Sequence, residues 1–302
     1  MTQLVQPLFE GPLDIVGDVH GEIDALGALL ARLGYAKDGS HPQQRRLVFV
    51  GDLTDRGPDS PAVIEKVQGL VESERAQCVL GNHDLNILLG HRKHDNHWFF
   101  GEPWALDEST EPTPAELADD SIRTRVLGFF QSLPVALERA GLRVVHACWN
   151  TSMIDIARGA EDVVGLYEMH RQGIQADLQA SEFDQIDRNL AHQNGNPVKV
   201  ITSGVEERVE KPFKKSGIVR NEKRVAWWAN YTDSELCVFG HYSLTPDKPH
   251  AFGNAHCIDY AVAKRWEERK ESHFTGTFQR KLAALRIPEM TVVFDDGTDP
   301  IN

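Results

Sequence analysis

Three apolar stretches near the N-terminus each run into a glycine and then into a cluster of polar residues. They are LDIVGDVHG at 13–21, LVFVGDLTDRG at 47–57 and QCVLGNHD at 77–84. Continuous apolar runs of this kind are typical of strands in a sheet that is covered on both faces. The segments between them, 22–35 and 60–74, repeat apolar residues at helical spacing. The pattern therefore predicts successive strand–helix–strand units and the α/β fold class.

The rest of the chain continues this alternation, with two interruptions. Further strands are predicted at LRVVHA (142–147), VKVIT (198–202), LCVF (236–239), AHCID (255–259) and MTVVF (290–294). Gly34 is expected to end the first helix, and Ser60 with Pro61 to begin the second. Helical and strand periodicity weakens at about 86–121 and 151–196, which we interpret as insertions over one edge of the sheet. We expect a single domain over residues 1–302.

Charge and cysteine content narrow the class of partner. The 302-residue chain has a formal net charge of −13, which argues against a general nucleic-acid coat or a basic membrane-surface protein. Its four cysteines form no CxxC pair, so reduced thiols are expected rather than a disulfide framework. The N-terminus has no basic stretch followed by an apolar run, and no apolar run is long enough to span a membrane. We therefore expect a cytoplasmic protein without a membrane or a stable nucleic-acid partner; its oligomeric state stays open.

Polar residues follow the carboxyl ends of several predicted strands. They are Asp18, His20, Asp52, Asn82, His146 and His241. Ligand crevices of open α/β sheets lie at this edge, so we expect these side chains to converge. Carboxylate, amide and imidazole ligands without a thiolate suit divalent Mn, Fe, Zn or Mg better than copper(I) or an iron–sulfur cluster. The residue types predict a site for a pair of divalent ions in which one aspartate can bridge both.

The motifs GDVHG, GDLTDRG and GNHD, followed by HA at 146–147 and GH at 240–241, resemble a known family in content and order. The chain is similar to the calcineurin-like metallophosphoesterases, specifically the phosphoprotein phosphatase branch, over about residues 13–294. The resemblance implies a two-sheet sandwich flanked by helices. It also implies a phosphoesterase that uses two divalent metal ions, with Mn expected first and Fe, Zn, Co, Ni or Mg as alternatives. In this family a metal-bridging hydroxide attacks phosphorus in line.

The same resemblance implies a role for each motif residue. Asp18 and His20 match ligands of the first metal, Asp52 matches the bridge, and Asn82, His146 and His241 match ligands of the second. His83 matches the general acid for the leaving oxygen and Asp55 its orienting partner, while Arg56, with Asn82, would bind the substrate phosphate. A second phosphate-binding arginine falls in the basic stretch 211–224, where Arg220 and Arg224 are both candidates. This stretch carries six basic residues and one acidic residue.

Substrate class depends on which branch the chain resembles more closely. VLGNHDLNILLG at 79–90 and GNPVKV at 195–200 resemble bacterial diadenosine tetraphosphatases and PrpE-like phosphatases. We therefore expect hydrolysis of dinucleoside polyphosphates, with a serine/threonine phosphoprotein phosphatase as the alternative. A non-catalytic metal-binding scaffold is a third hypothesis, although Asp52 and the catalytic motif residues are all retained. Cys148, in HAC at 146–148, departs from the family pattern, and its effect stays open.

Aromatic residues in the first insertion have two interpretations. Trp98, Phe99, Phe100 and Trp104 could stack a nucleobase, or they could pack the insertion onto the domain. Packing is the more common use of such residues, so we expect it here.

Overall fold

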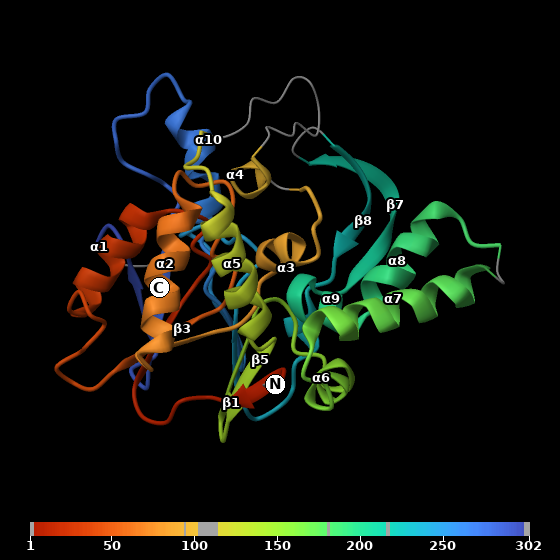
Figure 1. Ribbon diagram of the computed structural model, residues 1–302, viewed down its shortest axis with the longest axis horizontal. Helices are drawn as coiled ribbons and strands as arrows, with labels where there is room; N and C mark the ends of the chain where they lie inside the picture. The colour runs from red at the N-terminus through yellow and green to blue at the C-terminus, as the bar shows by residue number, and fades with distance from the viewer. Residues whose placement is uncertain (1–2, 94, 102–113, 180–181, 216–217, 299–302) are drawn as a thin grey trace.

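Two β-sheets packed face to face form the centre of the molecule. In the computed structural model, residues 3–93, 95–101, 114–179, 182–215 and 218–298 are described (Figure 1). The six-stranded sheet has the order β1-β5-β6-β9-β11-β10, formed by Val5–Pro7, Ala136–Arg139, Leu142–Val145, Leu236–Phe239, Ala255–Cys257 and Ala251–Phe252. The five-stranded sheet has the order β13-β12-β2-β3-β4, formed by Thr291–Phe294, Ala283–Ile287, Leu13–Val16, Arg46–Phe49 and Ala76–Cys78. The predicted two-sheet α/β class is confirmed.

The first half of the chain forms the predicted parallel units. Strands β2, β3 and β4 pair in parallel, and their crossovers are α1 (Ile23–Leu33) and α2 (Ser60–Glu72). Gly34 ends α1 in the left-handed conformation, at φ 95°, as expected. The cap of α2 is Asp59 rather than Ser60, because the Asp59 carboxylate accepts the amide of Ala62. In Figure 1, α1, α2 and α5 (Asp120–Ser132) lie in front of the sheets.

The space between the two sheets is filled by branched aliphatic side chains. Ile15 and Val48 from one sheet meet Val144 and Val238 from the other, and all four are fully buried. A larger apolar cluster lies between the outer sheet faces and the helices. Both faces of the central strands are therefore largely apolar, which is why these strands read as hydrophobic runs; Asp14 in β2 is a buried exception.

One predicted strand is a helix. VKVIT at 198–202 belongs to α9 (Pro197–Ser203). The side chain of Asn196 accepts the amides of Val198 and Lys199, and Pro197 occupies the first helical turn. A short apolar run fits a buried helix as well as a strand, and here the cap and the proline decide for the helix.

The helices of the second interpreted insertion and the strands of the basic stretch form the right-hand part of Figure 1. Residues 151–196 form helices α6 (Thr151–Arg158), α7 (Val163–Gln179) and α8 (Gln185–Gly195). The basic stretch lies in an antiparallel hairpin of β7 (Glu206–Lys215) and β8 (Ile218–Arg224). The first insertion contributes the last turns of α3 (Asn82–Leu88), the short helix α4 (His97–Phe100) and the start of α5, while residues 102–113, including Trp104, lie outside the described residues.

Among the described helices, none has both the length and the apolar character that crossing a bilayer requires. The four cysteines are buried and unpaired, in line with the expected reduced thiols.

Candidate active site

The predicted ligands lie in the turns that directly follow the strands. Asp18 and His20 follow β2, Asp52 follows β3, His146 follows β6, His241 follows β9 and Asn82 begins α3. His20, Asp52 and His241 adopt left-handed backbone conformations, with φ of 47°, 50° and 72°. A Cβ atom at Gly240 would lie 2.0 Å from Oδ1 of Asp18, so glycine is required for this close approach. Strained turns around convergent polar side chains are typical of functional sites.

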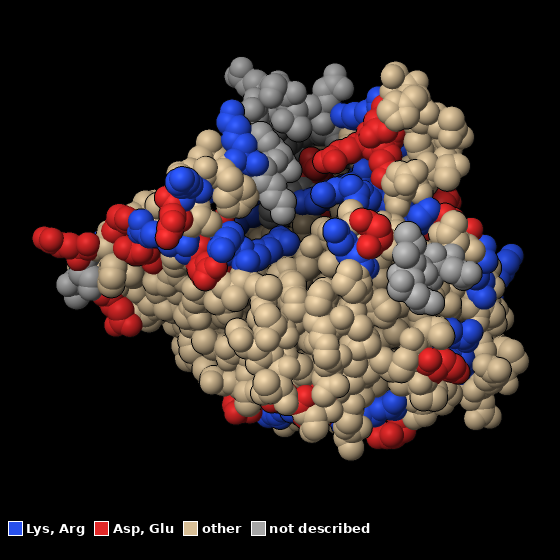
Figure 2. All heavy atoms as spheres, turned by 180° about the vertical axis from the view of Figure 1, so that it is seen from behind, with Lys and Arg blue, Asp and Glu red and all other residues tan. Residues whose placement is uncertain are grey.

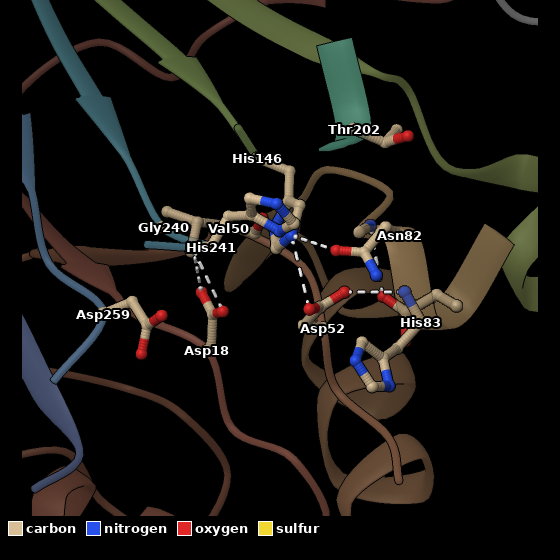
Figure 3. A network of polar contacts seen from close by, with 12 residues as sticks. Asp18, Val50, Asp52, Asn82, His83, His146, Thr202, Gly240, His241 and Asp259 are labelled. Atoms are coloured by element: carbon tan, nitrogen blue, oxygen red, sulfur yellow. Dashed lines mark hydrogen bonds and ion pairs between the residues drawn. The ribbon is translucent and has the colours of Figure 1, made fainter. Parts of the chain in front are cut away.

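Two groups of donor atoms share one carboxylate. His20, Asp52 and His83 offer ligand atoms within 4.8 Å of one another, and so do Asp52, His146 and His241. Nε2 of His146 lies 3.3 Å from Oδ2 of Asp52 and 3.2 Å from Oδ1 of Asn82 (Figure 3). Nε2 of His20 lies 3.7 Å from the same Asp52 oxygen and 3.8 Å from Oδ2 of Asp18. The carboxylate of Asp52 therefore has the position that a bridging ligand needs.

The backbone turns the histidine rings toward this centre. Nδ1 of His146 lies 2.7 Å from the carbonyl oxygen of Val50, and Nδ1 of His20 lies 2.9 Å from that of Thr54. When Nδ1 donates to a carbonyl, Nε2 carries the lone pair, which is the usual arrangement behind a metal-binding histidine. Nε2 of His241 is buried without a hydrogen-bond partner among the described residues. Such an orphaned nitrogen fits a metal ligand.

Burial and mutual charge dominate the electrostatics of the site. Burial, together with the nearby carboxylates of Asp259 and Asp52, raises the pKa of Asp18 well above its usual range. Burial alone would also raise the pKa of Asp52, but the histidines around it hold that pKa well below its usual range. Burial lowers the pKa of His241 well below that of a free imidazole, which keeps it neutral. Buried carboxylates beside neutral imidazoles favour bound cations.

A second chain of contacts leads away from the donor groups. Nδ1 of His83 lies 2.7 Å from Oδ2 of Asp55, and Nε1 of Trp98 donates to Oδ1 of Asp55, also at 2.7 Å. All three side chains are buried. The His83–Asp55 pair expected from the motifs is thus in contact, and Trp98 and Phe99 pack inside the molecule as expected. His83 also belongs to the first donor group, so its position is next to the metal site.

The structure separates the arginine candidates. Nη1 of Arg224 donates to the carbonyl oxygen of His241 at 2.8 Å, which brings Arg224 to the rim of the site. Arg220 lies farther out on the hairpin, opposite Phe213. Both arginines are exposed, so the contact with the His241 carbonyl is what distinguishes Arg224. Arg56 follows Asp55 in a left-handed conformation, at φ 67°. Burial lowers the pKa of His20, the nearby Asp52 carboxylate raises it, and the charge of Arg56 lowers it further. Figure 2 shows a hollow in the upper part of the view with several Lys and Arg side chains at its edge, next to some Asp and Glu side chains.

Sequence reasoning missed two buried aspartates beside the ligands. Asp84 accepts the amides of Leu53 and Gly81 and the hydroxyl of Thr54, so it ties two of the motif turns together. Asp259 accepts the amides of Ser243 and Ala261 and lies near Asp18 (Figure 3). Each had a signal in the sequence, because Asp84 ends GNHD and Asp259 ends the predicted strand AHCID.

The donor set fits two divalent metal ions. Its oxygens and imidazole nitrogens contain no thiolate, one carboxylate is shared, and one imidazole nitrogen is orphaned. A strand-end site of this composition on an α/β sandwich is typical of metal-dependent hydrolases.

Comparison with known proteins names the family. Residues 11–260 match the family model described as calcineurin-like phosphoesterase, and the chain belongs to this family of metal-dependent phosphohydrolases. It is 51% identical over 144 residues to the asymmetrical bis(5'-nucleosyl)-tetraphosphatase PrpE of Oceanobacillus iheyensis, covering 45% of this chain and 54% of that protein. It is 28% identical over 301 residues to the PrpE protein of Anoxybacillus flavithermus, covering 95% of both chains.

The chain spans about half the length of several curated relatives that it matches, including 56% of the one from Geobacillus. A crystal structure provisionally assigned as a diadenosine tetraphosphatase aligns over 100% of both chains, with a TM-score of 0.51 and 18% identity. At that identity the likeness shows the fold alone.

Proposed function

We propose that this protein hydrolyses phosphoanhydride bonds of dinucleoside polyphosphates with two divalent metal ions. The observation that carries the proposal is the Asp52 carboxylate shared by two buried donor groups, beside the His83–Asp55 pair. The predicted ligands Asp18, His20, Asp52, Asn82, His146 and His241 would hold the ions. Bound there, the ions would supply a water of lowered pKa and offset the charge of the phosphoryl oxygens.

The chain's own residues would bind the substrate and move a proton. Arg56 and Arg224 would bind phosphoryl oxygens, with Arg224 favoured over Arg220 by its contact with the His241 carbonyl. Asn82, at the start of α3, can orient one such oxygen. As an imidazolium, His83 would donate the proton on Nε2 to the leaving oxygen, while Asp55, 2.7 Å from Nδ1, would orient the ring and stabilise its charge. Each of these roles follows the motif positions and is supported by the geometry.

The nucleotide substrate class rests on the relatives. Curated proteins named bis(5'-nucleosyl)-tetraphosphatase align with this chain, one of them over 95% of its length. Basic side chains around a hollow in an acidic protein also suit a polyphosphate (Figure 2). We extend the proposal to Mn²⁺ as the first metal to test, to a single domain over 1–302 and to a cytoplasmic setting, in which the buried cysteines stay reduced.

The test is hydrolysis of diadenosine tetraphosphate with Mn²⁺, with EDTA, and by His83→Asn. We expect Mn²⁺-dependent turnover that falls about 10²-fold or more in the variant, as expected for a lost general acid. Separation of the products shows the cleavage position, since ATP plus AMP means asymmetrical cleavage and two ADP means symmetrical cleavage. A phosphopeptide panel runs beside it, and faster turnover there would favour the phosphoprotein phosphatase. If the metal-loaded protein turned over neither substrate, the non-catalytic metal-binding scaffold would be the remaining hypothesis.

A further inference from the structure

Trp98 is an aromatic residue of the first insertion whose polar atom contacts the proposed acid–base pair. It lies on α4, outside every strand-end motif, and is fully buried. Its Nε1 donates to Oδ1 of Asp55 at 2.7 Å, while the other oxygen of that carboxylate contacts Nδ1 of His83 at 2.7 Å. The three side chains thus form a continuous buried chain from indole to imidazole.

A packing role alone does not explain this contact. Phenylalanine would fill the same apolar space without a polar atom to satisfy, as Phe99 and Phe130 do elsewhere in the core. A buried carboxylate is also free to rotate about its terminal bond unless both oxygens are held. Here one oxygen is held by Trp98 and the other by His83, and the Asp55 amide donates to Oγ of Ser60 at 3.0 Å.

The indole also favours the ionised form of Asp55. Burial, with the carboxyls of Asp84 and Asp52 nearby, raises the pKa of this carboxyl well above its usual range, and the hydrogen bond from Trp98 opposes that shift. A correctly rotated Asp55 carboxylate accepts the Nδ1–H of His83 and stabilises the imidazolium, which can then give up the proton on Nε2.

We propose that Trp98 is a positioning residue for proton transfer, holding Asp55 so that Asp55 aims the His83 imidazole at the leaving oxygen. The inference rests on the proposed role of His83. In the step concerned, the oxygen of a hydroxide ion bonds to phosphorus as the bond from phosphorus to the leaving oxygen breaks. The His83 imidazolium gives its Nε2 proton to that leaving oxygen and ends as neutral imidazole, with the Nδ1 proton still shared with Asp55.

The experiment compares two esters that differ in their need for an acid. Phenyl phosphate has a poor leaving group and needs protonation, whereas 2,4-dinitrophenyl phosphate leaves without it. Trp98→Phe removes the indole N–H together with part of the ring, and we expect kcat/KM to fall about tenfold on phenyl phosphate, the effect of one lost hydrogen bond to a charged group. On the dinitrophenyl ester we expect a change of less than about twofold.

The matched control is Trp266→Phe, since Nε1 of Trp266 is buried without a partner among the described residues. This variant makes the same chemical change and is expected to leave both rates unaltered. Asp55→Asn should reproduce the leaving-group dependence, and adding Trp98→Phe to it should cause no further loss. Equal losses on both esters, or additive losses in the double variant, would overturn the positioning role.

A second measurement does not depend on a variant of Trp98. In the wild-type protein labelled with ¹⁵N-indole, Nε1–H of Trp98 should be shifted downfield and protected from exchange, and Asp55→Asn should remove both features. Their absence would overturn the contact itself. Wild-type protein that turns over neither ester would contradict the proposed function, whereas an active wild type with a flat leaving-group profile in Trp98→Phe contradicts only the positioning role.

Discussion

Two aspartates near the two ends of β2 are similarly buried but differ in their charged partners. Asp14, within the strand, is 0% exposed, and Asp18, just beyond it, is 2% exposed. Asp14 accepts hydrogen bonds from Tyr35, Arg45 and Arg286 at 2.8 to 3.0 Å. The chain itself supplies the cations that this carboxylate needs.

Among the described residues, Asp18 has no Arg or Lys partner. The hydrogen bond given to its carboxylate comes from the backbone amide of His241, and the nearby acids Asp259 and Asp52 raise its pKa while the nearby imidazole of His146 lowers it. A buried, unbalanced carboxylate costs stability unless an external cation binds. The contrast teaches that burial alone does not mark a functional acid, whereas burial without a protein cation does.

The largest expected effect is on the shared carboxylate of the metal site. Asp52→Asn should lower phosphoesterase activity by about 10³-fold or more, because several kcal/mol of transition-state stabilisation depend on the metals. Metal content, measured by atomic emission on the dialysed protein, should fall with it. Asp38→Asn, which changes an exposed charge, is the control. Retention of full metal content in Asp52→Asn would contradict the bridging role.

The matching change at the other end of β2 should act on stability instead. Asp14→Asn leaves the guanidinium of Arg45, which is 3% exposed, with less negative charge beside it. We expect the free energy of unfolding to fall by about 3–5 kcal/mol, the usual cost of breaking a buried ion pair. Urea unfolding measures this loss. The folded fraction should keep its metal and its kcat. A loss of activity without a loss of stability would contradict the structural role assigned to Asp14.

The two arginine candidates provide a smaller effect. Arg224→Ala should raise KM for diadenosine tetraphosphate about tenfold, the value of one charge-assisted hydrogen bond. Arg220→Ala, which removes the same charge from an exposed position on the hairpin, should change KM by less than about twofold. Steady-state kinetics at fixed ionic strength compares them. Equal effects would mean that the patch acts through its total charge rather than through a contact.

Asp18→Asn should raise the stability of the metal-free protein, whereas Asp14→Asn should lower stability. Without metal, the substitution removes a buried repulsion, so we expect the metal-free protein to gain about 1 kcal/mol in stability. Its affinity for Mn²⁺ should fall at the same time. Thermal unfolding in EDTA and titration with Mn²⁺ measure the two quantities, and a metal-free variant less stable than wild type would show that Asp18 already has its counter-charge.

The strand-end residues of the site were predictable, because each follows an apolar run and carries its own motif. Asp18, Asp52 and His146 needed no knowledge of distant contacts, since the carboxyl ends of neighbouring strands meet at one edge. Trp98 was different. Its sequence context shows an aromatic residue in a polar segment, and nothing local indicates that its indole N–H lies against Asp55, 43 residues earlier.

Local signals were also misread where two patterns compete. VKVIT has the β-branched residues of a strand, yet Asn196 and Pro197 start a helix there. The choice between Arg220 and Arg224 could not be made from spacing, because it depends on where the β7–β8 hairpin lies against His241. What the sequence alone lacks in both cases is the tertiary contact that decides between two permitted local structures.

The smallest expected effect is a pH dependence of stability that comes from His256, a histidine outside the site, which differs from His146 in the site. Asp52 raises the pKa of His146 to about 9 against the effect of burial, whereas burial, with His250 nearby, lowers the pKa of His256 to about 4. The unfolded chain takes up a proton at His256 as the pH falls below about 6.5, and the folded protein does so only near 4, so stability is lost over that interval. Between pH 8 and pH 6 the loss from this group should be about 1 kcal/mol. Urea unfolding of wild type and His256→Gln at both pH values isolates it, because all other groups are shared. The variant should show the smaller loss, and equal losses would mean that His256 is protonated in the folded protein as readily as in the unfolded chain.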